Sequence, residues 1–373
     1  MNNGIGGSTA QIELDKIANR TQGVQPIQLE EYQDRIKKAA SLMLNLDIKA
    51  VYLNAGTNLY YFTGTKWNAS ERMVGALLYA DGSLEYIVPK FEDGTFKKYM
   101  TVDARINCWE EHESPYALLG NLLKNKNITN GTIALDESAA YFLVYGVSKT
   151  NPAYNFINAQ PITTGCRIQK SANEIAIIQR AKDITMEVHR AVARMLRPGI
   201  SVKEVTEFIN SAHIKAGIPS GSYFCIVLFS DDSQYPHGVT VPQNLKENDI
   251  VLVDTGCQLE GYLSDITRTY VYGTPTERHR EIWNLEKQTQ QAAFDAAQIG
   301  ASCGSVDDAA RKVLAAAGLS GDYQLPGLPH RVGHGTGLDI HEHPYLVRGN
   351  ITTLQEGMVV SNEPMICIPG EFG

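Results

Sequence analysis

The sequence predicts an α/β (or α+β) protein of two domains: an amino-terminal α/β domain and a carboxyl-terminal domain whose antiparallel sheet is backed by helices. The first half of the chain alternates helix-like and short strand-like segments. The second half combines three amphipathic helix patterns with two apolar runs that can form a hairpin. At 373 residues, 43% of them hydrophobic, the chain is long enough to bury two cores.

The elements of the first half follow from apolar spacing. Residues 29–46 have the period of an amphipathic helix. Residues 50–53, 75–79 and 85–88 have the β-rich composition of short strands. Together they indicate a compact α/β domain.

The domain boundary is predicted near Thr164, because the chain is irregular there before a new helical pattern begins. This division gives an N-terminal extension (residues 1–24), an α/β domain (residues 25–164) and a carboxyl-terminal domain (residues 165–373).

A capping box opens the first helix of the carboxyl-terminal domain. Ser171 and Glu174 have the Ser-x-x-Glu spacing in which each side chain bonds the other residue's backbone N–H. The Arg-Pro-Gly tract at 197–199 ends this helix. Two further helices are expected at residues 202–216 and 276–297, and we expect all three to back the sheet. The apolar face of the first helix consists of Ile177, Ala181, Ile184, Val188, Ala191 and Met195.

The sheet is predicted from a hairpin that brings two carboxylates together. Residues 250–254 form a short apolar run that ends in Asp254, and a β-rich run at 268–272 begins soon after Asp265. Glu260-Gly261 offers a tight turn between them. A chain that folds back there places both aspartates on neighbouring strands, in a register that periodicity leaves open. Because two close carboxylates repel, they need a shared proton or a cation, and metal is the simpler explanation.

Two further metal-ligand side chains lie at similar turns, His334 in a glycine-rich tract and Glu363 in an Asn-Glu-Pro tract. Three carboxylates and one imidazole suit Mn²⁺, Co²⁺, Fe²⁺ or Zn²⁺. Taken singly, each aspartate can be a turn cap, and the histidine can be a loop residue bonded to a backbone carbonyl. The glycines on both sides of His334 favour a ligand, because they let the backbone approach a bound group closely.

Two tracts resemble known binding motifs, one for nucleotides and one for zinc, and neither fits. The tract at 333–337 is glycine-rich but lacks the G-x-G-x-x-G spacing, and the acidic and imidazole side chains that follow it disfavour a pyrophosphate. The His-Glu-His tract at 341–343 lacks two histidines one helical turn apart, and Pro344 disfavours a helix there.

The ordered set of these residues resembles the pita-bread metallopeptidases, namely aminopeptidase P, prolidase and the creatinase-like hydrolases. The resemblance covers most of the chain, from about Gln28 onward. It implies a creatinase-like α/β domain followed by a pita-bread catalytic domain with a curved antiparallel sheet backed by helices. The residues that carry it are Asp254, Asp265, His334 and Glu363, together with His237, His330 and His341.

The resemblance also implies roles. Asp254 would chelate one of two divalent ions, Asp265 would bridge both, and His334 and Glu363 would bind the other. Mn²⁺ is the first candidate, with Co²⁺, Zn²⁺ or Fe²⁺ as alternatives. A metal-bridging hydroxide would be the nucleophile and Glu363 the proton acceptor. His237 and His341 would contact the substrate or the tetrahedral intermediate, and His330 would lie close by.

One family ligand has no counterpart in the sequence given. The family has a bridging glutamate in an Arg-x-Glu-Asp tract soon after the segment at 369–373, and Glu371 precedes that position. We expect the natural chain to be longer. The second metal site is therefore expected to be incomplete in the chain as given.

The function implied is hydrolysis of the amide bond of Xaa-Pro peptides, by either an aminopeptidase or a dipeptidase. A dipeptidase would need a basic group for the proline carboxylate, for which Arg331 and Arg348 are candidates. A metal-dependent non-peptide amidohydrolase of the creatinase or ectoine hydrolase type is an alternative. A binding homologue with impaired catalysis is another.

Composition narrows the partners and the location. The formal net charge of −8 and the pI near 5.6 disfavour nucleic acid and anionic membranes as partners. The start of the chain lacks the basic and apolar regions of a signal peptide, so we expect a cytoplasmic protein, with an exported form left open. The six cysteines are expected to be reduced and buried. Assembly into a homodimer or homotetramer is a hypothesis.

Overall fold

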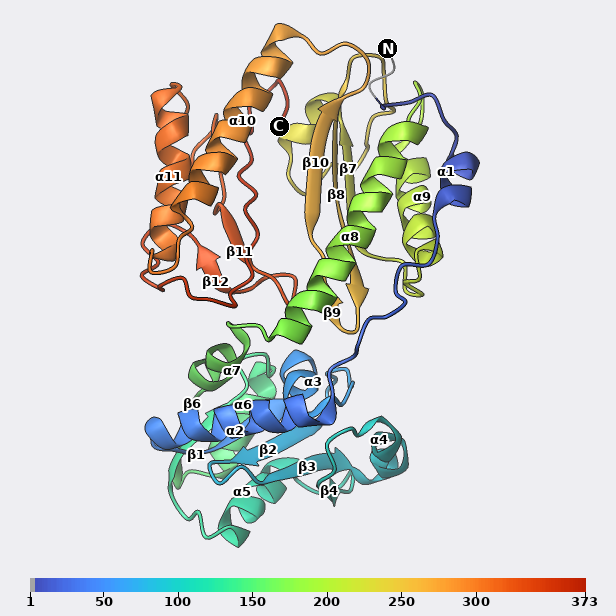
Figure 1. The fold of residues 1–373 in the computed structure, drawn as a ribbon. Coiled ribbons are helices and arrows are strands. Elements are labelled where there is room, and N and C mark those ends of the chain that lie inside the picture. The colour runs from blue at the N-terminus through green and yellow to red at the C-terminus, as the bar shows by residue number, and fades with distance from the viewer. Residues whose placement is uncertain (1–3) are drawn as a thin grey trace. The chain divides into compact units, whose positions relative to one another are not determined.

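The computed structural model describes residues 4–373, which divide into two compact units. One unit runs from Ile27 to Arg167, and the other combines the chain up to Pro26 with Ile168–Gly373. The segment treated above as an N-terminal extension thus belongs to the second unit. Its helix α1 (Ala10–Lys16) packs beside α8 (Ala172–Met195) and α9 (Val202–Lys215), as Figure 1 shows in blue and green.

The first unit is built on a six-stranded mixed sheet with the order β4-β3-β2-β1-β5-β6. β1, β2 and β3 pair antiparallel, whereas the remaining neighbours pair parallel. This arrangement confirms the predicted α/β class. The strands are β1 (Ile48–Asn54), β2 (Gly75–Tyr79), β3 (Leu84–Pro89), β4 (Arg105–Trp109), β5 (Gly131–Leu135) and β6 (Tyr154–Asn158).

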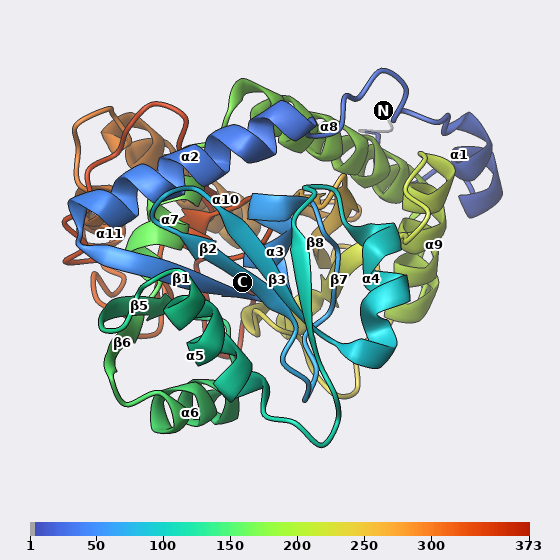
Figure 2. The same ribbon diagram turned by 90° about the horizontal axis from the view of Figure 1, so that it is seen from below.

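Helices cover both faces of this sheet. α5 and α6 pack on one face through apolar side chains such as Leu119, Leu123 and Val147, and α2 contacts β1 and β2 from the other side (Figure 2). The helices of this unit are α2 (Leu29–Asn45), α3 (Thr57–Thr63), α4 (Asp93–Tyr99), α5 (Pro115–Asn125), α6 (Tyr141–Thr150) and α7 (Gln160–Arg167), with a 3₁₀ turn η1 (Lys90–Glu92).

The second unit contains the antiparallel sheet that the hairpin predicted. Its strand order is β10-β8-β7, with β9 also paired to β8, and a separate pair is formed by β11 and β12. Helix α8 packs against β8, β9 and β10, and α9 packs against β7 (Figure 1). The elements are β7 (Ser222–Phe229), η2 (Ser230–Gln234), β8 (Ile250–Leu259), β9 (Tyr262–Leu263), β10 (Ile266–Val271), α10 (Glu277–Ala296), α11 (Cys303–Ala316), β11 (Gly333–Gly335) and β12 (Glu342–Leu346).

The predicted turn joins β8 to β9. Glu260 and Gly261 both have positive φ, 49° and 89°, which is the geometry of a two-residue hairpin turn. Leu259 pairs with Tyr262 across this turn, and the chain then continues into β10. In that register Thr267 lies opposite Asp254.

The predicted helix start is also confirmed. The Ser171 side chain accepts a hydrogen bond from the Glu174 N–H at 3.1 Å, and the Glu174 carboxylate accepts one from the Ser171 N–H at 2.8 Å. Within residues 4–373, no helix combines the length and apolar character needed to cross a membrane.

Candidate metal centre

Asp254 is presented by the central strand of the antiparallel sheet. The apolar run before it is buried on both faces of the strand, and Asp254 pairs with Ile226 of β7 and Thr267 of β10. Burial raises the pKa of Asp254 to about 6, and the charge of Glu363 adds to this effect. Its Oδ1 is buried and has no hydrogen-bond partner among the described residues. Because such an atom is costly to bury unpaired, it indicates a position for a cation.

Asp265 lies in the short connection between β9 and β10. Its side chain is only 7% exposed. Burial and the charges of Glu363 and Asp254 raise its pKa to about 7. The three carboxylates that the sequence placed in separate tracts therefore lie close enough to repel one another.

His334 and Glu363 face each other. The Nδ1 of His334 lies 3.0 Å from the Gly335 carbonyl oxygen, which can only accept, so Nδ1 carries a proton. The Nε2 is then directed at the carboxylates, 2.7 Å from Glu363 Oε1 and 3.5 Å from Asp265 Oδ2. This ring orientation presents Nε2 as a metal ligand.

The environment of Glu363 sets its charge. Burial raises the pKa of Glu363, but the hydrogen bond with His334 and the charge of that ring outweigh burial and lower it. The Ser361 hydroxyl donates to Glu363 Oε1 at 2.9 Å. The Glu363 N–H donates to the Val332 carbonyl at 2.9 Å, which joins its segment to the chain just before β11.

The glycines around His334 have a structural use that the sequence did not predict. A Cβ at Gly333 would lie 2.1 Å from the Ser361 carbonyl oxygen, and a Cβ at Gly335 would lie 2.4 Å from that of His343. These glycines therefore let β11 approach the neighbouring backbone. Their role in packing around the histidine adds to the expectation that they make room for a bound group.

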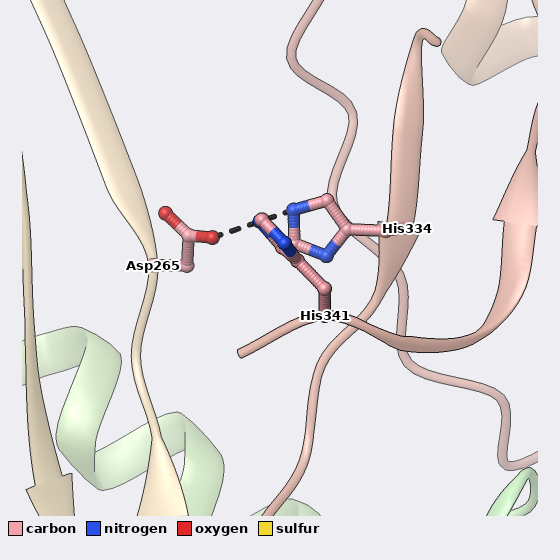
Figure 3. Close-up of side chains that lie close together, drawn as sticks. All are labelled: Asp265, His334 and His341. Atoms are coloured by element: carbon pink, nitrogen blue, oxygen red, sulfur yellow. Dashed lines mark ion pairs between the residues drawn. The ribbon is translucent and has the colours of Figure 1, made fainter. Parts of the chain in front are cut away.

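His341 is exposed but lies against the buried ring of His334. The two ring centroids are 4.2 Å apart in an edge-on arrangement. One ligand atom from each of Asp265, His334 and His341 lies within 4.8 Å of the others. Figure 3 shows the carboxylate of Asp265 opposite the two imidazoles, which come from another part of the chain. The sequence assigned His341 to the substrate, and the geometry also brings it within reach of a shared ion.

The two other predicted histidines lie around the same group. His237 follows η2, is exposed, and lies close enough to Asp254 and His341 to interact electrostatically with both. His330 bonds through Nδ1 to the Arg331 carbonyl at 2.7 Å, and its charge lowers the pKa of Glu363.

The two candidate arginines differ. Arg348 is held at the surface by ion pairs with Asp308 and Asp322. Arg331 stacks over the Tyr345 ring at 4.3 Å and makes no ion pair with any residue the structure describes. After burial and the charge of His334, the charge of Arg331 also lowers the pKa of His341, so the guanidinium lies near the His341 ring.

The sequence did not predict the side chains that hydrogen-bond to these ligands or to the segments that carry them. Ser361 donates to Glu363 and also accepts the His334 N–H at 2.9 Å. On α11, Asp307 and Arg311 form a buried ion pair at 2.6 Å, and Asp307 accepts the Val332 N–H at 3.0 Å. The only signal for this pair was a four-residue spacing of opposite charges in an otherwise apolar helix.

The residues present fit a divalent metal. Hard oxygen donors and an oriented imidazole converge, two of the carboxyls have raised pKa values, and one buried oxygen lacks a partner. A cation at this position would relieve the repulsion among the carboxylates. It would also satisfy the unpaired oxygen of Asp254.

Comparison with known proteins identifies the family. Residues 176–373 match metallopeptidase family M24, and residues 35–169 match the creatinase/prolidase N-terminal domain. The chain belongs to metallopeptidase family M24. Membership implies that the chain binds divalent metal, and it confirms the predicted resemblance and fold class.

The relatives match this chain over nearly its whole length. "Probable dipeptidase PepE" of Mycobacterium tuberculosis is 31% identical over 352 residues, covering 92% of this chain and 90% of the relative. The crystal structure of dipeptidase PepE from Mycobacterium ulcerans has a TM-score of 0.86 and 30% identity, covering 93% of this chain and 92% of that one. Prolidase from Pyrococcus furiosus has a TM-score of 0.75 and 28% identity, covering 89% and 93%.

Proposed function

We propose that the protein is a metal-dependent dipeptidase that hydrolyses the amide bond before a carboxyl-terminal proline. The observation that carries this proposal is the convergence of Asp254, Asp265, His334 and Glu363 in a chain of a metallopeptidase family. Relatives named as dipeptidase and prolidase support the substrate class. The Xaa-Pro bond is selectable, because the proline ring fixes φ and removes the N–H.

The metal complement we propose is two divalent ions, with Mn²⁺ as the first candidate. The ligands would be the three carboxylates and the Nε2 of His334, and the position of His341 makes it a further candidate ligand. When bound, such ions supply a water of lowered pKa and polarise the scissile carbonyl.

The chain's own groups would handle the protons. Glu363 has a lowered pKa, so it is ionised at neutral pH and can accept a proton from the attacking water and pass it to the leaving nitrogen. Ser361 holds the accepting carboxylate in place. Burial and the charge of His334 lower the pKa of His341, so its neutral ring can donate one N–H to the substrate oxygen as negative charge develops.

Arg331 supports a dipeptidase over an aminopeptidase. A dipeptide places its carboxylate directly after the proline, so a cation beside the metal ligands would select it. Arg331 lies close enough to His341 to contribute to lowering its pKa, is held on an aromatic ring, and has no ion-pair partner among the described residues. Arg348 does not meet this condition, because Asp308 and Asp322 already neutralise it.

A substrate panel tests the reaction. With Mn²⁺ present, we expect release of the first residue from Gly-Pro, slower turnover of Arg-Pro-Pro, and no turnover of creatine or ectoine. Turnover of creatine or ectoine alone would overturn the peptidase assignment. Preference for Arg-Pro-Pro would overturn the dipeptidase assignment and leave the peptidase assignment standing.

A second measurement tests Arg331. The wild-type protein should prefer Gly-Pro to Gly-Pro amide, which lacks the carboxylate, by about 10- to 100-fold in kcat/KM, the range for a hydrogen bond between charged groups. Arg331→Met should remove most of this preference, chiefly through KM for Gly-Pro. Arg348→Met is the matched control and should keep it. An unchanged preference in Arg331→Met would refute the assignment.

A further inference from the structure

An ion pair lies in the interior of the second unit, next to the loop that carries His341. Lys170 and Glu342 bond to each other with side chains only 1% and 9% exposed. The two residues are 172 positions apart. Burying two charges is unfavourable unless their geometry is held by other contacts, and a buried pair adds little net stability compared with apolar side chains. The position of the pair therefore points to a role beyond stability.

Glu342 occupies the inside of the loop that carries His341. It follows His341 directly, and its backbone pairs with Gly335 at the end of β11. Its carboxylate also accepts the Asp339 N–H at 3.4 Å. A Cβ at Gly337 would lie 2.5 Å from Glu342 Oε1, so glycine at this position leaves room for the carboxylate. The loop is thus shaped around the Glu342 side chain.

The same loop is joined to the connection that carries Asp265. The Gly337 carbonyl accepts the Leu263 N–H at 2.9 Å, two residues before Asp265. On its other side, His341 lies edge-on against His334. A shift of the Glu342 carboxylate would therefore move His341 relative to both Asp265 and His334.

Lys170 holds this carboxylate from a fixed point. The backbone N–H of Lys170 donates to the Gly357 carbonyl at 2.8 Å, and the neighbouring Gln169 side chain donates to the Glu356 carbonyl at 3.1 Å. The next residue, Ser171, caps α8. The ammonium group therefore extends from a backbone segment that is anchored on both sides.

We propose that Lys170 and Glu342 are positioning residues, which hold the 337–341 loop so that His341 faces the metal ligands. They act through His341 and contact neither substrate nor metal. The inference rests on the proposed function for its kinetic consequence, and its structural consequence stands without it.

The test compares Lys170→Met with Glu13→Gln. Glu13 is fully buried and ion-paired at 2.6 Å with the partly exposed Arg194 and Lys16 in the same unit, so Glu13→Gln controls for loss of a buried ion-paired charge away from the site. Amide hydrogen exchange of the metal-free protein should speed up in residues 336–342 of Lys170→Met and stay unchanged there in Glu13→Gln. In the Mn²⁺-loaded protein, Lys170→Met should lower kcat for Gly-Pro by about 10- to 100-fold, the range for misplacing a reacting group, with metal content retained.

A double variant covers the case in which Lys170→Met does not fold. Lys170→Met/Glu342→Gln leaves no unpaired charge and should show the same loop exchange and the same loss in kcat. Loss of kcat without faster exchange in residues 336–342 would overturn the positioning role, as would faster exchange spread evenly over the unit. A wild-type protein inactive on Gly-Pro, combined with faster loop exchange in Lys170→Met, would overturn the proposed function and support the positioning of the loop.

Discussion

At the scale of single residues, the carboxylates of the site differ in charge at neutral pH. Burial and mutual repulsion raise the pKa of Asp254 and Asp265, whereas His334 lowers that of Glu363. The imidazole faces Glu363 more closely than it faces Asp265. The carboxylates also raise the pKa of His334, against the effect of its burial. Metal binding must therefore remove protons from the two aspartates and from Nε2 of His334.

Proton release on metal binding should be measurable. The pKa of Asp254 is about 6 and that of Asp265 is about 7. At pH 6 in the metal-free protein, Asp254 is therefore about half protonated and Asp265 is largely protonated. Mn²⁺ should displace about one proton or more at pH 6 and fewer at pH 8, so apparent affinity rises with pH. Titration calorimetry in buffers of different ionisation enthalpy counts the protons. Equal proton release at both pH values would contradict this prediction.

Two substitutions separate proton transfer from metal retention. Glu363→Gln preserves volume but removes a charge and the proton acceptor, so turnover of Gly-Pro should fall by about 10² or more. His341→Ala should lower turnover while metal content stays near the wild-type value. Metal analysis after dialysis, beside steady-state kinetics, distinguishes the two. Loss of metal from His341→Ala would instead make His341 a ligand, as its distance from Asp265 and His334 allows.

At the scale of elements, β11 contains no residue with a β-branched side chain. It is a three-residue Gly-His-Gly strand, held by pairing with β12 and by a bridge from Gly335 to Val360. Its glycines remove the Cβ atoms that would strike the neighbouring chain. Local propensity does not predict such a strand, because only long-range contacts stabilise it.

Gly335→Ala should therefore destabilise the protein and displace His334. The added Cβ would lie 2.4 Å from the His343 carbonyl oxygen, which is backbone and cannot move cheaply. We expect a loss of about 1–3 kcal/mol in the free energy of unfolding, with weaker Mn²⁺ binding. Gly94→Ala is the control, since a Cβ there meets nothing within 4 Å and helix α4 should gain about 0.5–1 kcal/mol. Equal metal affinity in wild type and Gly335→Ala would count against this role for β11.

The sequence predicted the elements whose signals are local. The capping box of α8 and the Glu260-Gly261 turn are properties of a few adjacent residues, and the structure contains both. The strand β11 and the pair formed by Lys170 and Glu342 were missed, because each depends on contacts across long stretches of chain. The ligand set was predicted from residue types at turns, and likeness to a known family supplied the role of each ligand, since spacing alone does not show that separate tracts meet.

At the scale of the whole molecule, the catalytic unit is assembled from both parts of its chain. The Gly6 and Ser8 N–H groups donate to carbonyls near the end of α8, and the buried Glu13 pairs with Arg194. The interior of this unit also contains two histidines on adjacent helices. Burial lowers the pKa of His189 and of His213 to about 4. Global stability therefore depends on keeping both rings neutral.

The two buried histidines make the folded state less stable as the pH falls. An unfolded histidine has a pKa near 6.5, so between about pH 4 and 6.5 the unfolded chain binds more protons at His213 than the folded chain does, and stability falls as the pH falls. Asp254 and Asp265 oppose this trend in the metal-free protein, because their raised pKa values favour the folded state on acidification.

Comparing wild type with His213→Gln isolates the histidine contribution. The glutamine cannot titrate but can still bond Thr185 and Ser222, the partners of His213 at 3.3 and 2.9 Å. From pH 7 to pH 5, wild type should lose about 2 kcal/mol more of its free energy of unfolding than the variant does. This loss follows because folding lowers the pKa of His213 from 6.5 to about 4. Urea unfolding of the metal-free proteins at both pH values measures this difference. Identical pH dependence in the two proteins would mean that folding does not lower the pKa of His213.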